Sequence, residues 1–248
     1  MADYFSNQSA VYAKNRPFYP NELFLFLKDI CAEHQLAWDV ATGNGQCAVS
    51  LADYFKNVFA TDLSAQQLGN SFQRPNITYK LEHAEQSSLP DCSVDLITVA
   101  TAIHWFDIPA FYKEVQRVLK PNGILAVWGY AASAIDVEID KIINEFAFET
   151  LESYWPAQTR LNWEDKYEHL PFPYPLLNMP IYKAAAQQNY AEFISYMNSW
   201  SAIQVYLKQH HQNPIDQIQE KLLNAWGNAD EVKTVLWQLN LKCGRNAV

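Results

Sequence analysis

The sequence predicts an α/β fold built on a mostly parallel, doubly wound sheet. Short apolar or β-branched runs alternate with amphipathic stretches between residues 36 and 130. A glycine-containing turn follows the first of these runs, and a later run, Val94–Ala100, is almost wholly apolar. A strand covered by helices on both faces has that character. Strands that alternate with helices form a parallel sheet, whose ligands bind at the carboxyl ends of its strands.

The individual elements follow from their periodicity. Five strands are predicted in this half, at Leu36–Ala41, Asn57–Thr61, Ile77–Leu81, Val94–Ala100 and Ile124–Trp128. Apolar residues three and four positions apart predict a helix after the first strand and another after the fourth. These helices carry Ala48, Leu51, Ala52 and Phe55 in the first case, and Phe111, Val115, Val118 and Leu119 in the second. The run Lys120-Pro121-Asn122-Gly123 predicts a turn before the fifth strand.

The second half has a different pattern. Helical stripes are predicted over Ile135–Phe146, Tyr190–Met197 and Ile215–Trp226, with a segment rich in Trp, Tyr and Pro over Tyr154–Pro180. Apolar residues alternate with mostly polar ones over Val235–Leu241, which predicts a half-exposed antiparallel strand. We therefore expect a helical and aromatic cap, followed by one antiparallel C-terminal strand.

Composition limits the classes of partner. The chain has 248 residues and a formal net charge of −9, without a basic run. Nucleic-acid binding needs clustered cations, so we expect no nucleic-acid partner. No apolar run reaches the roughly 20 residues of a membrane span, and the first residues do not resemble a signal peptide. Four cysteines without a Cys-x-x-Cys pair indicate reduced thiols, a cytoplasmic location and no metal site.

The strongest local motif joins the first strand to the first helix. Gly43 and Gly45 in this turn allow a tight bend and close approach of a ligand, although an ordinary strand–helix turn has similar glycines. Asp62 ends the second strand about 20 residues later, where a carboxylate can bind ribose hydroxyls. Its alternative role is to cap the next helix.

Two nucleotide-type ligands fit this motif. The run from Gly43 to Ala48 also matches a dinucleotide fingerprint, which leaves an NAD-dependent oxidoreductase as an alternative. Asp39 disfavours it, because a carboxylate at the strand end repels a pyrophosphate by on the order of 1 kcal/mol. S-adenosylmethionine has no phosphate and carries an ammonium and a sulfonium, which Asp39 would attract.

The run Asp39-x-Ala41-x-Gly43-x-Gly45 resembles the first motif of class I methyltransferases, with Ala41 in place of the usual glycine. The runs His83-Ala84-Glu85, Val94-Asp95-Leu96-Ile97 and Leu119–Leu125 are similar to later motifs of that class. More specifically, Tyr12-Ala13-x-x-Arg16-Pro17-x-Tyr19-Pro20 and Ala102-Ile103-His104-Trp105-Phe106 resemble the type-11 subgroup that contains trans-aconitate methyltransferase-like enzymes.

The resemblance implies a Rossmann-like, seven-stranded sheet in a single domain, 1–248. Its parts would be N-terminal lid helices (1–35), an S-adenosylmethionine-binding core (36–130), a cap and acceptor region (131–230) and a C-terminal strand (231–248). It also implies a set of cofactor-binding residues: Tyr12, Arg16, Asp39, Ala41, Gly43, Asn44, Gly45, Asp62, Leu63, Ala84, Glu85, Thr101 and Ala102.

The acceptor side is predicted after the fourth strand. His104 is a candidate base, a donor to an acceptor carboxylate, or an ordinary structural histidine. Trp105 is a candidate pocket wall, with core packing as its alternative. Arg16 can clamp a carboxylate or lie on the solvated surface. We expect a small-molecule acceptor, methylated on a carboxylate oxygen. A protein that binds S-adenosylmethionine without turnover is the other alternative.

Overall fold

The computed structural model describes residues 17–157, 159 and 166–247. Seven strands form one sheet in the order β3-β2-β1-β4-β5-β7-β6. The first five strands are parallel, whereas β7 runs antiparallel to both β5 and β6. The strands span Leu36–Val40 (β1), Asn57–Asp62 (β2), Ile77–Leu81 (β3), Val94–Ala100 (β4), Leu119–Ala134 (β5), Lys183–Gln188 (β6) and Lys233–Arg245 (β7).

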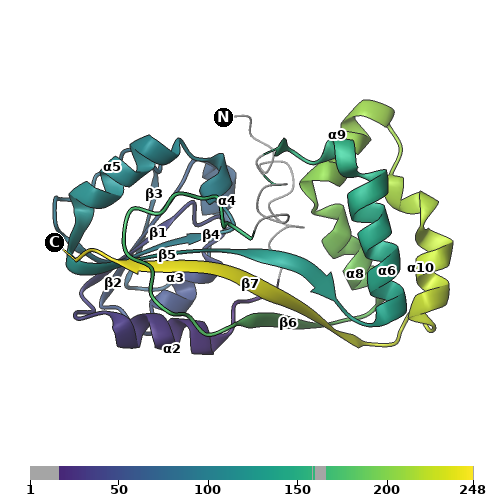
Figure 1. Cartoon of the computed structure of the whole chain (residues 1–248), viewed down its shortest axis with the longest axis horizontal. Helices are drawn as coiled ribbons and strands as arrows, with labels where there is room; N and C mark the ends of the chain where they lie inside the picture. The colour runs from purple at the N-terminus through teal and green to yellow at the C-terminus, as the bar shows by residue number, and fades with distance from the viewer. Residues whose placement is uncertain (1–16, 158, 160–165, 248) are drawn as a thin grey trace.

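Helices cover both faces of the parallel part of the sheet (Figure 1). Side chains alternate between the two faces of β5, so that Ala126 and Trp128 lie in one apolar cluster and Leu125 and Val127 in the other. The helices of the parallel part are α2 (Asn21–Ile30), α3 (Gln46–Leu51), α4 (Ala65–Gly69), the 3₁₀ helix η2 (Ile103–Trp105) and α5 (Ile108–Val118). Coverage on both faces explains why the strands β1, β4 and β5 are so apolar.

Helix α2 belongs to the core. Leu23, Phe24 and Leu27 are buried in the same cluster as Trp128, and the rings of Phe24 and Trp128 meet edge to face at 6.5 Å. Lid helices are predicted over 1–35 from the sequence; Asn21–Ile30 is a helix whose apolar stripe packs against the sheet, and the lid role stays a prediction. The rest of that prediction falls mainly on residues 1–16, which lie outside the described residues.

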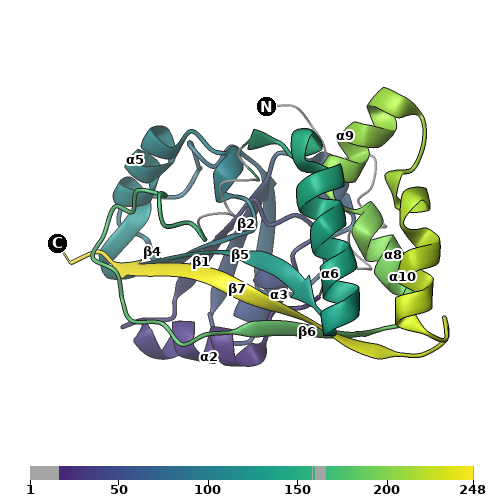
Figure 2. The ribbon, with the colours of Figure 1, turned by 45° about the vertical axis from the view of Figure 1, so that its right-hand side comes forward.

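A helical cap stands at one end of the sheet (Figures 1 and 2). Its longer helices are α6, α8, α9 and α10, and strands β5 and β7 extend toward it. Phe193, Trp226 and Trp237 are buried in it. The elements of this region are α6 (Val137–Glu145), the π-helical turn η3 (Phe146–Thr150), α8 (Tyr190–Asn198), α9 (Ser201–His210), α10 (Gln219–Trp226) and the 3₁₀ turns η4 (Glu152–Tyr154) and η5 (Pro214–Gln217).

The seven-stranded, mostly parallel sheet is confirmed, with two differences at its antiparallel end. Strand β6, which has the sequence Lys-Ala-Ala-Ala-Gln-Gln, has no counterpart in the sequence prediction because alanine and glutamine are not strand-forming residues. The prediction that a turn at Lys120–Gly123 separates the preceding helix from the fifth strand is wrong, since β5 already begins at Leu119. The turn residues instead form an irregularity in the pairing with β4, and Asn122 has a φ of 63° there.

Candidate active site

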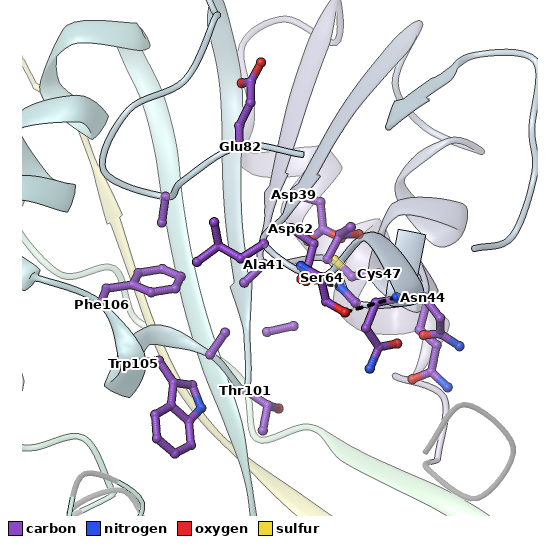
Figure 3. Close-up of a pocket in the computed structure, with 18 of the residues that line it drawn as sticks. Asp39, Ala41, Asn44, Cys47, Asp62, Ser64, Glu82, Thr101, Trp105 and Phe106 are labelled. Atoms are coloured by element: carbon purple, nitrogen blue, oxygen red, sulfur yellow. Dashed lines mark hydrogen bonds between the residues drawn. The ribbon is translucent and has the colours of Figure 1, made fainter. Parts of the chain in front are cut away.

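A pocket opens where β1, β2 and β4 end, at the point where the strand order reverses between β1 and β4. Open α/β sheets bind ligands at such switch points. The cavity has a volume of about 290 Å³. Its lining includes eleven of the fifteen residues predicted for the site: Asp39, Ala41, Gly43, Asn44, Asp62, Leu63, Ala84, Glu85, Thr101, Ala102 and Trp105. Figure 3 shows how several of these side chains converge from different strands.

Four predicted residues are not part of that lining as described. Gly45 and His104 are absent from the set of residues that border the cavity. Tyr12 and Arg16 lie outside the described residues. Gly45 still contributes through its backbone, because it has a φ of 86° and a Cβ there would overlap the hydroxyl of Tyr79. Gly45 thus shapes the loop, and the lining comes from its neighbours.

Ten further lining residues are not among the fifteen predicted site residues, although Tyr19 and Phe106 stand in the quoted motifs. The ten residues are Tyr19, Thr42, Gln46, Cys47, Ser64, Gln67, Glu82, Ala100, Phe106 and Tyr130. Positions 42, 46 and 64 adjoin predicted residues in the same turns, so proximity alone could have found them. Gln67 and Tyr130 had no such signal, because they reach the pocket only through the packing of α4 and β5.

The loop after β1 is wound through left-handed conformations. Ala41, Gly43 and Gly45 have φ angles of 52°, 58° and 86°. A Cβ on Gly43 would have no atom within 4 Å, so its surroundings are open. Ala41 occupies the same region of φ without glycine's freedom, which costs roughly 1–2 kcal/mol. The loop therefore keeps the glycine-type shape at the position where the family motif has glycine.

Asp39 is the buried carboxyl group beneath this loop. Its side chain is fully buried and accepts hydrogen bonds from the hydroxyls of Thr42 and Thr98, the latter at 2.8 Å. Burial raises the pKa of the Asp39 carboxyl, and the threonine hydrogen bonds counteract part of that shift. A cation bound nearby would favour the charged form.

Asp62 lies at the end of β2 and holds two backbone groups. One carboxylate oxygen accepts a hydrogen bond from the N–H of Gly43 and the other from the N–H of Ser64, both at 2.8 Å. The capping role is instead taken by Ser64, whose hydroxyl accepts from the N–H of Gln67. Asp62 thus joins the two loops that border the pocket.

Acidic side chains also line the edge beyond β3. Glu82 accepts a hydrogen bond from the N–H of Ser88 at 2.9 Å, and Glu85 accepts one from the N–H of Asp107 at 3.0 Å. Glu114 on α5 holds the segment that follows Glu85. Its carboxylate accepts hydrogen bonds from both the N–H and the hydroxyl of Ser87. These contacts fix the loop that carries Ala84 and Glu85.

Aromatic side chains form the opposite part of the wall. Tyr19 stacks on Tyr130 with ring centroids 5.3 Å apart, and its hydroxyl lies 3.4 Å from the Thr101 hydroxyl. Thr101 has a φ of 57°, an unusual conformation for a β-branched residue. Trp105 and Phe106 border the same region (Figure 3). A strained residue at a pocket wall is a common feature of functional sites.

The electrostatics of the pocket are acidic. Asp39, Asp62, Glu82 and Glu85 contribute four carboxyl groups, and the described lining residues include no Lys, Arg or His. Across the described part of the chain, no group of three or more His, Cys, Asp or Glu side chains could hold a metal ion. No helix among the described residues is long and apolar enough to cross a membrane. The described pocket therefore suits a cationic or polyhydroxyl ligand.

This geometry defines an α/β protein that binds a nucleoside-type ligand at its switch point, and comparison with known proteins specifies its class. Residues 38–127 match the model of a family described as a methyltransferase domain. A candidate methyltransferase of Dictyostelium discoideum is 34% identical over 92% of this chain and 88% of its own length. The chain belongs to the methyltransferase family, and its methyl donor is S-adenosylmethionine.

Solved structures agree with this assignment. A candidate type II methyltransferase from Anaeromyxobacter dehalogenans has a TM-score of 0.86 and 31% identity, and the match covers 93% of this chain and 98% of that one. A phosphoethanolamine N-methyltransferase of Haemonchus contortus, solved with S-adenosyl-L-methionine, shares the fold with a TM-score of 0.52 and 16% identity. That match covers 98% of this chain and 58% of the Haemonchus chain. The fingerprint read as an NAD site is thus part of a methyltransferase loop.

Proposed function

We propose that the chain transfers a methyl group from S-adenosylmethionine to a small molecule, and that the methylated atom is a carboxylate oxygen. The observation that carries the first part is the aromatic wall, with Tyr19, Trp105 and Tyr130, that borders the cavity beside the methyltransferase loop. Small-molecule sites are concave, mostly apolar and furnished with a few polar groups. A folded protein or a nucleic-acid strand would need a wider and, for nucleic acid, a cationic surface.

The residues that would hold the donor fit its chemistry. A sulfonium and an ammonium are cations, and Asp39 supplies a buried carboxylate beneath the loop. The ribose hydroxyls would find acceptors in Asp62 and Glu82, both of which line the cavity. Leu63 and Ala84 would offer apolar contact to the adenine, and Glu85 would accept from its amino group. S-adenosylmethionine supplies an electrophilic methyl group on sulfur.

The acceptor end would act mainly by positioning. Tyr19, Trp105 and Tyr130 would exclude water and orient the acceptor, which raises the rate of an in-line transfer. The hydroxyls of Tyr19 and Thr101, 3.4 Å apart, would donate hydrogen bonds to a carboxylate. A carboxylate is already deprotonated near pH 7, so this reaction requires no general base.

The acidic lining makes one requirement of this proposal explicit. Four carboxyl groups disfavour an anionic acceptor unless a cation compensates them. Arg16 is the predicted cation for this role, and it lies outside the described residues. The same acidic lining favours a neutral or amine acceptor as the second candidate.

A turnover screen tests the carboxylate acceptor against the neutral or amine acceptor. Purified protein with S-adenosylmethionine is incubated with panels of small carboxylic acids, phenols and amines, and release of S-adenosylhomocysteine is measured. We expect turnover with an acid, and Arg16→Met should raise the KM for that acid about tenfold or more. Arg74→Met, in the exposed segment before β3, is the matched control. Turnover confined to phenols or amines would overturn the carboxylate assignment, and methylation of only a macromolecule would overturn the small-molecule assignment.

A further inference from the structure

The connection between β3 and β4, residues 82–93, is a loop over its whole length. Its first part borders the cavity through Glu82, Ala84 and Glu85. Its second part lies against α5 and does not border the described cavity. A loop has no regular ladder of backbone hydrogen bonds to fix its conformation, so other partners must satisfy and hold its backbone groups. The contacts of the second part therefore decide where the first part stands.

Two side chains of α5 hold the second part of this loop. The carboxylate of Glu114 accepts hydrogen bonds from the N–H and the hydroxyl of Ser87, at 2.7 and 2.6 Å. The guanidinium of Arg117 donates to the carbonyl of Leu89 at 2.8 Å and to the carboxylate of Asp91 at 2.6 Å. Arg117 Nε also donates to Glu114 Oε2 at 2.9 Å. One ion pair thus grips three residues of the loop, and we call Glu114 and Arg117 the loop clamp.

The charges of the loop clamp serve geometry more than stability. Glu114 is only 7% exposed. Burial alone would raise the pKa of its carboxyl, but hydrogen bonds from Arg117 and Ser87 hold that pKa below its usual value. Replacing a buried ion pair by apolar residues of similar volume is often neutral or stabilising, so stability is a weak reason for this pair. The fork of a guanidinium, by contrast, fixes the direction of each of its hydrogen bonds.

The loop clamp is connected to the cavity through backbone groups. The carboxylate of Glu82 accepts a hydrogen bond from the N–H of Ser88 at 2.9 Å, and Ser88 directly follows the clamped Ser87. The carboxylate of Glu85 accepts one at 3.0 Å from the N–H of Asp107, the N-cap residue of α5. Both lining carboxylates are therefore held by groups whose position depends on how the loop sits on α5.

We propose that Glu114 and Arg117 are positioning residues that set the selectivity of the site for adenine. The inference rests on the proposed function, in which Glu85 accepts a hydrogen bond from the adenine amino group. Hypoxanthine has a carbonyl oxygen in place of that amino group, and a carboxylate held beside it faces a second acceptor without a proton between them. A carboxylate that can move away avoids this penalty, so discrimination between the two bases requires the loop to be held.

Calorimetry with two probes tests the proposal. The probes are S-adenosylhomocysteine and S-inosylhomocysteine, the same compound with hypoxanthine in place of adenine. The wild type should prefer the adenine compound about tenfold or more, the scale of an unpaired polar group at a binding site. Arg117→Met and Glu114→Gln should weaken its binding about tenfold while changing that of the hypoxanthine compound by less than about threefold. Arg117→Lys, which keeps the charge but not the fork, should retain an intermediate preference.

The ratio of the two dissociation constants separates positioning from a structural role. Partial unfolding weakens both probes by the same factor and leaves their ratio unchanged. Lys113→Met is the matched control, because Lys113 is an exposed cation on the same helix. It should leave both dissociation constants unchanged. The measurements need neither an acceptor nor turnover, so failure of the proposed carboxylate methylation would not affect them.

The alternatives give distinct results. Equal weakening of both probes in folded variants, with the adenine preference retained, would overturn the proposal and limit the loop clamp to support of the fold. Unchanged binding of both probes would overturn it as well. A wild type that binds the two probes equally would show that Glu85 does not read the base, which also overturns it. If Arg117→Met does not fold, as judged by circular dichroism, Arg117→Lys and Glu114→Gln decide.

Discussion

The carboxylate of Asp62 accepts a hydrogen bond from the backbone N–H of Gly43 at 2.8 Å, across the two loops that follow neighbouring strands. Its other oxygen accepts from the N–H of Ser64. One side chain therefore organises the loop after β1 and also borders the cavity. Ligand affinity and loop stability are coupled through this residue, and the coupling can be measured.

Asp62→Ala should weaken S-adenosylhomocysteine binding by roughly 1.5–3 kcal/mol. The substitution removes hydrogen-bond acceptors for a polar ligand and also the acceptor of the Gly43 N–H. The unfolding temperature should fall by a few degrees, since two backbone N–H groups lose their acceptor. Calorimetry and thermal unfolding measure the two effects. Asp53→Ala is a suitable control, because Asp53 is exposed and its side chain lies 3.8 Å from Arg74. An unchanged dissociation constant would limit Asp62 to a structural role.

Ala41→Gly should stabilise the ligand-free protein by up to about 1 kcal/mol. The left-handed conformation costs alanine roughly 1–2 kcal/mol, and glycine removes that cost. Glycine also makes the unfolded chain more flexible, and the larger entropy lost on folding offsets about half of the gain in stability. Urea denaturation measures the difference. Ala48→Gly, within α3, should instead destabilise the protein by about 1 kcal/mol or more. Destabilisation by Ala41→Gly would show that the loop tolerates alanine without strain.

Asp39→Asn should make the ligand-free protein more stable at pH 7 and weaken donor binding about tenfold. Burial raises the pKa of the Asp39 carboxyl in the folded protein above its value of about 4 in the unfolded chain. Folding therefore favours the protonated carboxyl, and the wild type loses stability as the pH rises from about 4 toward the folded-state pKa. The stability gap between variant and wild type should therefore widen from pH 4 to pH 7. Urea titrations at a series of pH values measure it.

The donor-binding half of this prediction has its own signature. Asp39→Asn should weaken S-adenosylmethionine at least as much as S-adenosylhomocysteine, because only the former carries the sulfonium charge. A gap in stability that stays constant with pH would show that Asp39 does not titrate in this range.

Trp105→Ala should lower kcat/KM for the acceptor about ten- to a hundredfold, since Trp105 lines the cavity and removing it opens the wall to water. His104→Ala should cost less than about tenfold, because His104 is not among the lining residues. Steady-state kinetics with donor saturation give both values. Complete loss of turnover in a folded, donor-binding His104 variant would identify an obligatory base and a protonated acceptor.

The parallel part of the fold was predictable because its signals are local. Four strands were located to within one residue at either end, since apolar runs and the turn at Gly43 mark them directly. Strand β6 was not predictable, because Ala184 and its neighbours become a strand only by pairing with β7. Helix α9 was missed for a similar reason: its buried residues, Ala202 and Ile203, acquire their environment from the cap.

The same distinction applies to the site. Asp39, Gly43 and Asp62 lie in short motifs whose chemistry a sequence displays. Gln67 and Tyr130 enter the pocket through tertiary packing, and neither differs in type from many surface or core residues. That Gln67 is buried without a partner on its Oε1 is a property of the fold alone.

Strand β5 is 16 residues long and pairs with the 13-residue β7 from Ile124 to Ala134. At about 3.3 Å per residue, β5 extends roughly 50 Å. It links the pocket-bearing sheet to the cap by a backbone ladder that has one register shift, between Tyr130 and Ser133. The two halves cannot swing apart on a hinge without breaking that ladder. Thermal denaturation should accordingly be a single cooperative transition, and exchange of substrate and product should proceed through local rearrangement at the pocket mouth while the two halves keep their relative orientation.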